Sequence, residues 1–271
     1  MSPALSLSAG WLVLMVLAGL LAPLIAPYGY AEQDLLARLS PPSWQGGAPG
    51  HLLGTDHLGR DVFSRALYAI RISMTVALLG AAIGAVIGTT LGTLAAHFRG
   101  LIEELIMGLV DVQAALPFLI FALLVIAFFG NDLLLFILLV GFQGWERYAR
   151  LARGLVLDAQ TRGYARAARS MGFLPWRVYV RHVGPNIAGA MAVQFTLNLP
   201  ETILLEAGLS FLGLGIQPPL TSLGLMLNDS RAFIVLNWWL PAVPSALIFL
   251  TALAMSLLGD ALRDRLDSST L

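Results

Sequence analysis

Apolar runs near 20 residues long alternate along the chain with shorter polar segments. An α-helix that crosses the hydrocarbon core of a bilayer needs about 20 apolar residues. The composition agrees, because 58% of the residues are hydrophobic and only 12% are charged, and mean hydropathy is +0.79. We therefore predict an all-α integral membrane protein with six transmembrane helices. The predicted spans are Ala9–Ala26, Ile72–Ala96, Leu105–Phe129, Leu133–Tyr148, Ile187–Leu205 and Trp238–Leu258.

The arginines divide unevenly between the two sides that these spans define. With the amino terminus inside, eleven arginines fall on the inner side and five on the outer side. The positive-inside rule favours this orientation, which places both termini in the cytoplasm. The first apolar run ends near Pro27 and has no basic residue before it. A cleaved signal peptide is therefore an alternative, and it would leave five spans.

Two regions follow from this arrangement. Residues 1–71 hold the first transmembrane helix and an outer segment, and residues 72–271 hold a five-helix core with an inner loop at 149–186. From Asp61 onward, apolar residues recur at helical spacing up to Ile70. This pattern fits an amphipathic helix at the outer interface, and it fits equally well a simple extension of the second span.

The second span carries four glycines at a strict spacing of four, Gly80, Gly84, Gly88 and Gly92. Such a stripe lies on one side of a helix and lets another helix approach closely. We predict tight helix packing along it, with a neighbour in this chain or in a partner, and we keep a pore-lining hinge as the alternative.

Several polar residues lie within the predicted spans, among them Asp111 in the third span and Asn198 and Glu201 in the fifth. Ionisable groups at membrane depth are costly and usually face a bundle interior or a water-filled path. These three residues are our candidates for a translocation pathway. Buried polar contacts that fix helix packing are an equally good interpretation of the two acids.

The composition excludes several kinds of chemistry. The chain has no cysteine, so thiolate nucleophiles and disulfides are excluded. All sixteen cationic side chains are arginines, and a phosphate-binding loop that ends in Gly-Lys-Ser/Thr requires a lysine. Any ATP hydrolysis must therefore take place on another subunit. The outer histidines His51 and His57 have no recognised metal-ligand spacing, and we expect them to be solvated rather than to bind metal.

The inner loop is strongly basic over Thr161–Asn186, "TRGYARAARSMGFLPWRVYVRHVGPN". Three arginines at i, i+4 and i+7, from Arg162 to Arg169, fall on one face of a short predicted helix. The opposite face is small and partly apolar, and Gly172 is a natural helix stop. The small face suits a groove on a partner protein, whereas the basic face also suits anionic lipid headgroups.

Four blocks of the chain resemble a known family. "RAARSMG" (Arg166–Gly172) with "HVGP" (His182–Pro185) is similar to the EAA loop of permease subunits of ABC importers, in the dipeptide/oligopeptide/nickel branch. Arg166 stands where that family has Glu, and Gly184 where it has Leu. The other blocks are "GTDHLGRDVFSR" (Gly54–Arg65), "GLSFLGLGIQPPLTSLGLML" (Gly208–Leu227) and "LGDALRDRLD" (Leu258–Asp267).

The resemblance implies a type I ABC importer permease of the bacterial inner membrane, whose inner loop between spans four and five couples to an ATPase. The coupling residues would be Tyr164, Arg166, Ala167, Ala168, Met171 and Gly172. The implied partners are a second homologous permease, two ATPase subunits that carry ATP and Mg²⁺, and an extracytoplasmic solute-binding protein. No cofactor is expected in this chain. The implied solute is a di- or oligopeptide, with nickel chelates or opine-like solutes as alternatives.

Two other classes of function remain open from the sequence. One is a self-sufficient secondary transporter that uses Asp111 or Glu201 as an ion relay, and the other is a membrane scaffold.

Overall fold

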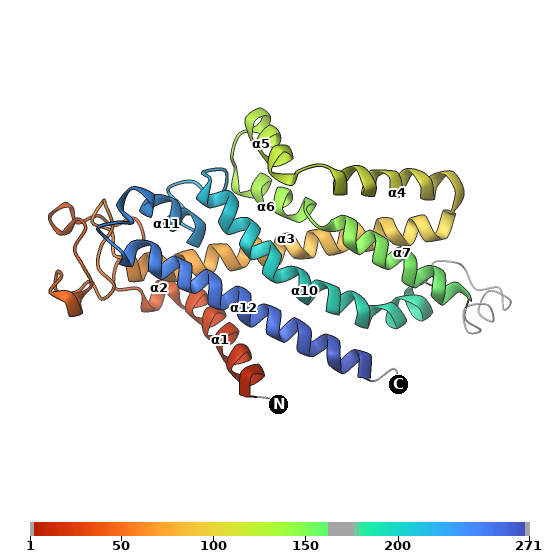
Figure 1. The fold of residues 1–271 in the computed structure, drawn as a ribbon, viewed down its shortest axis with the longest axis horizontal. Helices are drawn as coiled ribbons and strands as arrows, with labels where there is room; N and C mark the ends of the chain where they lie inside the picture. The colour runs from red at the N-terminus through yellow and green to blue at the C-terminus, as the bar shows by residue number, and fades with distance from the viewer. Residues whose placement is uncertain (1–2, 162–176, 178, 269–271) are drawn as a thin grey trace.

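The fold is helical in the part of the chain that the structure, a computed structural model, describes, which is residues 3–161, 177 and 179–268 (Figure 1). The elements in order are α1 (Pro3–Leu20), α2 (Ala22–Ile25), the 3₁₀ turns η1 (Leu35–Ala37) and η2 (Ser43–Gln45), α3 (Val62–Phe98), α4 (Gly100–Ala115), α5 (Phe118–Phe129), α6 (Leu133–Phe142), α7 (Trp145–Thr161), the π-helical turn η3 (Tyr179–Val183), α10 (Gly184–Phe211), α11 (Leu223–Ser230), the 3₁₀ turn η4 (Arg231–Phe233) and α12 (Trp239–Ser268).

Three helices within the described residues, α1, α3 and α12, are long and apolar enough to cross a membrane, and a fourth span follows if α4 and α5 count as one. The predicted count of six therefore stays a prediction. α1 covers residues 3–20 and a separate short α2 follows, so the single predicted helix over residues 9–26 is wrong. α10 and α12 both extend past their predicted spans.

α3 is the central helix of the molecule, with α1, α6, α7 and α10 packed against it (Figure 1). The Asp61 carboxylate caps its first turn by accepting a hydrogen bond from the backbone N–H of Ser64 at 2.7 Å. From there the helix runs without a break through residue 71 to Phe98. The stretch after Asp61 is thus an extension of the second span and not a separate interfacial helix.

The glycine stripe of α3 faces α6 and α7 of the same chain. A Cβ on Gly80 would lie 2.7 Å from Val140 Cγ1, and one on Gly84 would lie 2.9 Å from the Gly141 carbonyl oxygen. Gly88 and Gly92 sit closer still to the backbone of α7, at Trp145 and Ala149. A larger residue at Gly84, Gly88 or Gly92 would require a facing backbone to move, so the stripe sets how closely α7 approaches α3.

The predicted third span is broken in the structure. α4 and α5 are bent by 95° at the break between them. Pro117 explains the break, because proline disfavours the helical region for the preceding residue. Leu116 is accordingly extended, with φ −82° and ψ 130°.

The predicted fourth span, Leu133–Tyr148, is also two helices. α6 ends at Phe142 and α7 begins at Trp145, with Gly144 between them at φ +93°. A positive φ is readily available to glycine and breaks the helical path. α7 then continues for 17 residues as a more polar helix.

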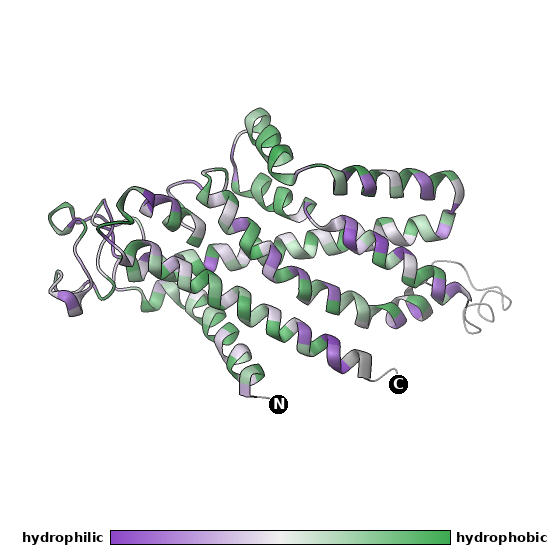
Figure 2. Ribbon diagram, viewed as in Figure 1, coloured by the Kyte–Doolittle hydropathy of each residue, from purple (hydrophilic) through white to green (hydrophobic). Residues whose placement is uncertain are grey.

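Polar residues gather at particular places on this apolar frame (Figure 2). Hydrophilic residues colour the irregular segment between α2 and α3, and also α7 and the carboxyl-terminal part of α12. The first residues of α1 and the last residues of α12 both lie away from that irregular segment (Figure 1). Polar residues thus concentrate in two regions, one at the start of α3 and one along α7.

Candidate translocation surface

α7 has two faces of different chemistry. Its buried face, which includes Trp145, Tyr148, Ala149 and Ala152, packs toward the glycine stripe of α3. Arg147, Arg150 and Arg153 are spaced at intervals of three and lie together on another side of the helix. The glycines therefore fix α7 in position while its arginines point elsewhere.

Each of these three arginines forms an ion pair with an acidic residue on a helix other than α7. Arg147 pairs with Glu201 of α10, and Arg150 pairs with Asp111 of α4 at 3.0 Å. Arg153 pairs with Glu103, also on α4. We call these three pairs the α7 ladder. It connects α4 to α10 by way of α7.

Two pairs of the α7 ladder, those of Arg147 and Arg150, are open to their surroundings, whereas the Arg153–Glu103 pair is partly buried. The side chain of Asp111 is 74% exposed, and that of Glu201 is 50% exposed. Exposed ion pairs of this kind contribute about 0–1 kcal/mol each to stability. Charged groups at membrane depth usually face water or a protein partner rather than lipid. The ladder is therefore a surface on which charges are present, weakly held and accessible.

Asn198 has a different position from the two acids. It is buried, and its Nδ2 donates to Thr202 Oγ1 at 3.4 Å. Its Oδ1 has no hydrogen-bond partner and would lie 3.3 Å from a Cβ on Gly144. Of the three pathway candidates, Asp111 and Glu201 thus meet along α7, while Asn198 sits inside, at the joint between α6 and α7.

Glu206, one and a half turns beyond Glu201, is fully buried. It accepts a hydrogen bond from Ser210 Oγ at 2.9 Å, and the hydroxyls of Ser73 and Ser222 also interact with its carboxyl group. These serines come from α10, α3 and the N-cap of α11. Glu206 therefore joins three elements and is not part of the exposed ladder.

The second polar region holds the irregular segment against α3 and α11. Asp56 accepts from Arg60 Nε at 2.6 Å and pairs with Arg65, and both arginines also reach Asp229 of α11, at 3.0 and 2.9 Å. We call these four residues the Asp56 network. The side chains of Asp56 and Arg65 are only 5% and 3% exposed.

The pKa of Asp56 reflects this setting. Burial alone would raise the pKa of the carboxyl group, but Arg65, Arg60 and the backbone N–H groups of Arg60 and Leu58 outweigh burial, and the pKa is lowered below its ordinary value. Asp56 is therefore held as a carboxylate between two guanidinium groups.

Our expectation of a solvated His51 is wrong. His51 is buried, its Nδ1 lies 3.0 Å from Asp61 Oδ1, and its ring stacks on Tyr28 at 4.8 Å. His57 stacks on Phe233 at 5.6 Å. One feature of the sequence indicates this polar packing, namely the close spacing of Asp56, Arg60 and Asp61. The sequence alone does not show that Asp61 contacts His51 or that Arg60 reaches Asp229.

Among the residues with described positions, no group of three His or acidic side chains is arranged to hold a metal ion.

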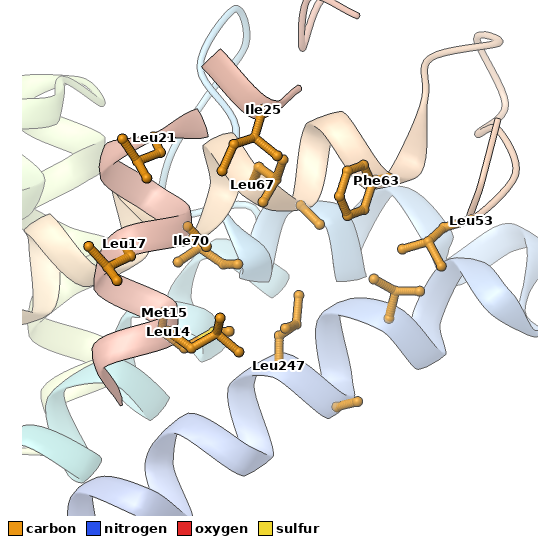
Figure 3. Close-up of a pocket in the computed structure, with 14 residues that line it drawn as sticks. Leu14, Met15, Leu17, Leu21, Ile25, Leu53, Phe63, Leu67, Ile70 and Leu247 are labelled. Atoms are coloured by element: carbon orange, nitrogen blue, oxygen red, sulfur yellow. The ribbon is translucent and has the colours of Figure 1, made fainter. Parts of the chain in front are cut away.

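A cavity of about 630 Å³ lies between α1, α3 and α12. Figure 3 shows its lining, to which α1 contributes Leu14, Met15 and Leu17, α3 contributes Phe63, Leu67 and Ile70, and α12 contributes Leu247. Every lining residue is apolar, so the cavity offers no side-chain partner to the charged ends of a polar solute. A translocation path does not run through it.

The predicted coupling residues Tyr164, Arg166, Ala167, Ala168, Met171 and Gly172 lie outside the described residues. The two ends of that loop do have described positions. Gln160 Nε2 donates to the Tyr179 hydroxyl at 2.8 Å, and that hydroxyl lies 2.9 Å from His97 Nδ1. Sequence reasoning missed this junction, which ties both ends of the loop to the end of α3.

Comparison with known proteins defines the class. The model of the binding-protein-dependent transport system inner membrane component family matches residues 88–271, more than half of the chain. The chain therefore belongs to that family, which confirms the resemblance and the interpretation of a transport subunit. Membership implies a solute-binding protein and an ATPase as partners. A second model, the N-terminal TM domain of oligopeptide transport permease C, matches residues 3–42.

Individual relatives are similar over almost the whole chain. The dipeptide transport system permease protein DppC of Escherichia coli (strain K12) is 42% identical over 95% of this chain and 86% of its own length. The di/tripeptide transport system permease protein DppC of Pseudomonas aeruginosa (strain UCBPP-PA14) is 39% identical over 95% of this chain and 85% of its own length. A solved structure of the inward-facing MetNI methionine ABC transporter has the same fold, with a TM-score of 0.61 at 18% identity, covering 72% of this chain and 94% of that one.

Proposed function

We propose that this chain forms half of the translocation pathway of an ATP-driven importer of di- and oligopeptides, delivered by a solute-binding protein. The observation that carries the proposal is the α7 ladder, with Glu201–Arg147 and Asp111–Arg150 exposed side by side. The names of the relatives support the choice of peptides as solute.

The chemistry of the α7 ladder suits a peptide. A free peptide carries an ammonium group at one end and a carboxylate at the other. A surface that presents both carboxylates and guanidinium groups can exchange its own ion pairs for pairs with the solute. Because each internal pair is worth only about 0–1 kcal/mol, the exchange costs little and does not trap the solute.

A second permease would complete the pathway on the side of α4 and α5. Only Val110 and Ala122 are buried on these two helices. α4 also exposes Glu104 and Asp111. Exposed acids at membrane depth disfavour contact with lipid alone, so a homologous permease that encloses water with this face is the partner that fits.

Coupling and sidedness complete the proposal. We place both termini in the cytoplasm, because the arginine distribution favours it. Tyr164, Arg166, Ala167, Ala168, Met171 and Gly172 would contact an ATPase subunit, and ATP with Mg²⁺ would bind there and not to this chain. The junction of His97, Gln160 and Tyr179 would carry the movement of that contact into α3.

The test is uptake by the assembled complex. The chain is reconstituted in proteoliposomes with its second permease, two ATPase subunits and the solute-binding protein, and uptake of a radiolabelled dipeptide is measured. We expect uptake to require ATP and the binding protein, and to persist when an ionophore collapses ion gradients. Dipeptide uptake by the chain alone, without ATP, would assign it to the secondary transporters, and uptake of a nickel chelate but not of the dipeptide would reject the peptide assignment.

Arg166→Glu tests the coupling contact separately, because it restores the acid that the family carries at this position. We expect the reversal of charge to change the stimulation of ATP hydrolysis by the loaded binding protein. Arg38→Glu, in the irregular segment between α2 and α3 and away from the loop, is the control. Unchanged stimulation in Arg166→Glu would remove this residue from the contact.

A further inference from the structure

Arg71 is an exposed arginine in the third turn of α3 that no other part of the described chain neutralises. Its guanidinium forms no ion pair or hydrogen bond with any described residue, whereas Arg60 and Arg65 in the same region each form ion pairs with Asp56 and Asp229. α1 crosses α3 at this residue, since a Cβ on Gly19 would lie 3.1 Å from Arg71 Cα. The charge therefore sits beside a crossing of two membrane-spanning helices.

A polar cavity of about 350 Å³ lies on one side of Arg71. It is lined by Tyr30, Tyr68, Arg71, Ile72, Thr75, Leu220 and Thr221. The two tyrosine rings are 5.0 Å apart. Thr221 is only 3% exposed and its Oγ1 has no hydrogen-bond partner. A buried hydroxyl without a partner is costly, which points to a ligand that supplies one.

An apolar cavity of about 100 Å³ continues from the same place. It shares Arg71 and Thr75 with the polar cavity, and its other lining residues are Met15, Val16, Gly19, Leu20, Met74 and Leu78. Tyr68 in the first cavity and Leu78 in the second are ten positions apart on α3, or about 15 Å at 1.5 Å per residue. That length equals about half of the 30 Å hydrocarbon core, the depth of one leaflet.

We propose that this pair of cavities is a binding site for one anionic phospholipid. The phosphate lies at Arg71, with the Tyr30 and Tyr68 hydroxyls as further donors, and one acyl chain follows the groove between α1 and α3. No acidic residue lines either cavity, so the cation of a zwitterionic headgroup has no partner here. The charge of Arg71 is complementary to a headgroup with net negative charge.

The nearby cavity of about 630 Å³ differs from the Arg71 site because it has no polar side chain in its lining. It lies between α1, α3 and α12 and has apolar lining only. It offers nothing to a headgroup, so selectivity for lipid charge belongs to the Arg71 site. The proposal depends on the position of the chain in a membrane and not on the identity of the transported solute.

The test uses the chain purified together with its partner subunits, delipidated in detergent and titrated with dioleoyl phosphatidylglycerol or dioleoyl phosphatidylcholine, with bound lipid counted by native mass spectrometry. We expect one tightly bound phosphatidylglycerol and weaker binding of phosphatidylcholine. Arg71→Gln should weaken phosphatidylglycerol binding by about tenfold or more, the effect of losing a hydrogen bond to a charged group. Arg38→Gln is the matched control, because Arg38 is exposed in the same outer segment and its Nε donates to the His57 carbonyl instead.

A second variant tests the acyl-chain half of the site. Val16→Trp should fill the groove and weaken binding of dioleoyl but not of dihexanoyl phosphatidylglycerol. Thermal unfolding of each variant complex verifies that it is folded. Four results would overturn the proposal: equal losses in Arg71→Gln and Arg38→Gln, equal binding of the two headgroups, displacement of the lipid by millimolar inorganic phosphate, or no lipid bound by the assembled complex, which would mean that a partner subunit covers the site.

Discussion

The Asp56 network and the α7 ladder both consist of arginines paired with acidic residues, but they differ in how deeply the charges are buried. In the network, Asp56 and Arg65 are almost completely buried, and two acids share two arginines. In the ladder, each arginine reaches an acid on another helix, and the pairs of Arg147 and Arg150 are largely exposed. Burial and not residue type separates the two regions.

The difference shows how one chain can hold charges both rigidly and loosely. Removing one partner from a buried ion pair leaves an uncompensated charge and costs several kcal/mol, whereas an exposed pair is worth little. The network therefore fixes the irregular segment and α11 onto α3. The ladder leaves charges available for exchange, as a path for charged solutes requires.

The largest expected effect comes from Arg65→Met. This variant removes the most buried cation of the network, and Asp56 and Asp229 each lose one of their two ion pairs. We therefore expect a loss of about 3–5 kcal/mol in the free energy of unfolding. Arg147→Met in the ladder is the matched change, with an expected loss of about 1 kcal/mol or less. Denaturant unfolding of the purified chain, followed by tryptophan fluorescence, measures both. Equal losses would erase the distinction between the two regions.

A smaller effect should appear as a dependence of stability on pH. The folded-state pKa of Asp56 is lowered, so its contribution to stability is complete above the ordinary carboxyl value of 3.8 and is lost as the pH falls through the lower folded value. Asp56→Asn cannot titrate. The gap in unfolding free energy between the natural chain and this variant should be constant from neutral pH to about pH 4 and should narrow below it. A gap that widens on acidification would contradict the lowered pKa.

Sequence reasoning found the two acids of the α7 ladder but not their partners, and it did not identify the Asp56 network. Asp111 and Glu201 were identified because acids at membrane depth are rare. Their partners Arg150 and Arg147 were assigned only to the inner side, since the rotation of α7 about its axis depends on the glycine stripe of α3. His51 was expected in solvent because sequence spacing does not show that the irregular segment folds back onto Asp61. The partners of these arginines and the burial of His51 depend on contacts between residues far apart in the sequence.

The fold was predictable where a local rule dominates. The apolar run over Ile72–Ala96 predicted most of the central helix, and the spacing of four glycines predicted close packing at Gly80 to Gly92. The break at Pro117 follows from proline chemistry, but its 95° bend does not. That angle depends on what α5 packs against, which proline chemistry does not determine.

The next prediction concerns uptake. Glu201→Gln keeps the size of the side chain but removes the charge opposite Arg147, so we expect dipeptide uptake by the reconstituted complex to fall by roughly tenfold, as for a loss of about 1.4 kcal/mol at a limiting step. Glu32→Gln is the control, because Glu32 is exposed in the irregular segment between α2 and α3 and belongs neither to the α7 ladder nor to the Asp56 network. Co-purification of the partner subunits verifies assembly. Normal uptake in Glu201→Gln would remove this residue from the pathway.

The smallest expected effect is the coupling energy between Asp111 and Arg150, which depends on whether water or protein surrounds the pair. A double-mutant cycle of Asp111→Asn and Arg150→Gln should give a coupling energy of roughly 0.2–1 kcal/mol in the purified chain, because Asp111 is 74% exposed. A coupling above about 2 kcal/mol in the chain alone would place this pair with the Asp56 network. In the assembled complex the same cycle tests the proposed second permease. An unchanged coupling means that water still reaches the pair, as the pathway requires, whereas a large increase means that the partner buries it and that α4 contributes an interface and not a path.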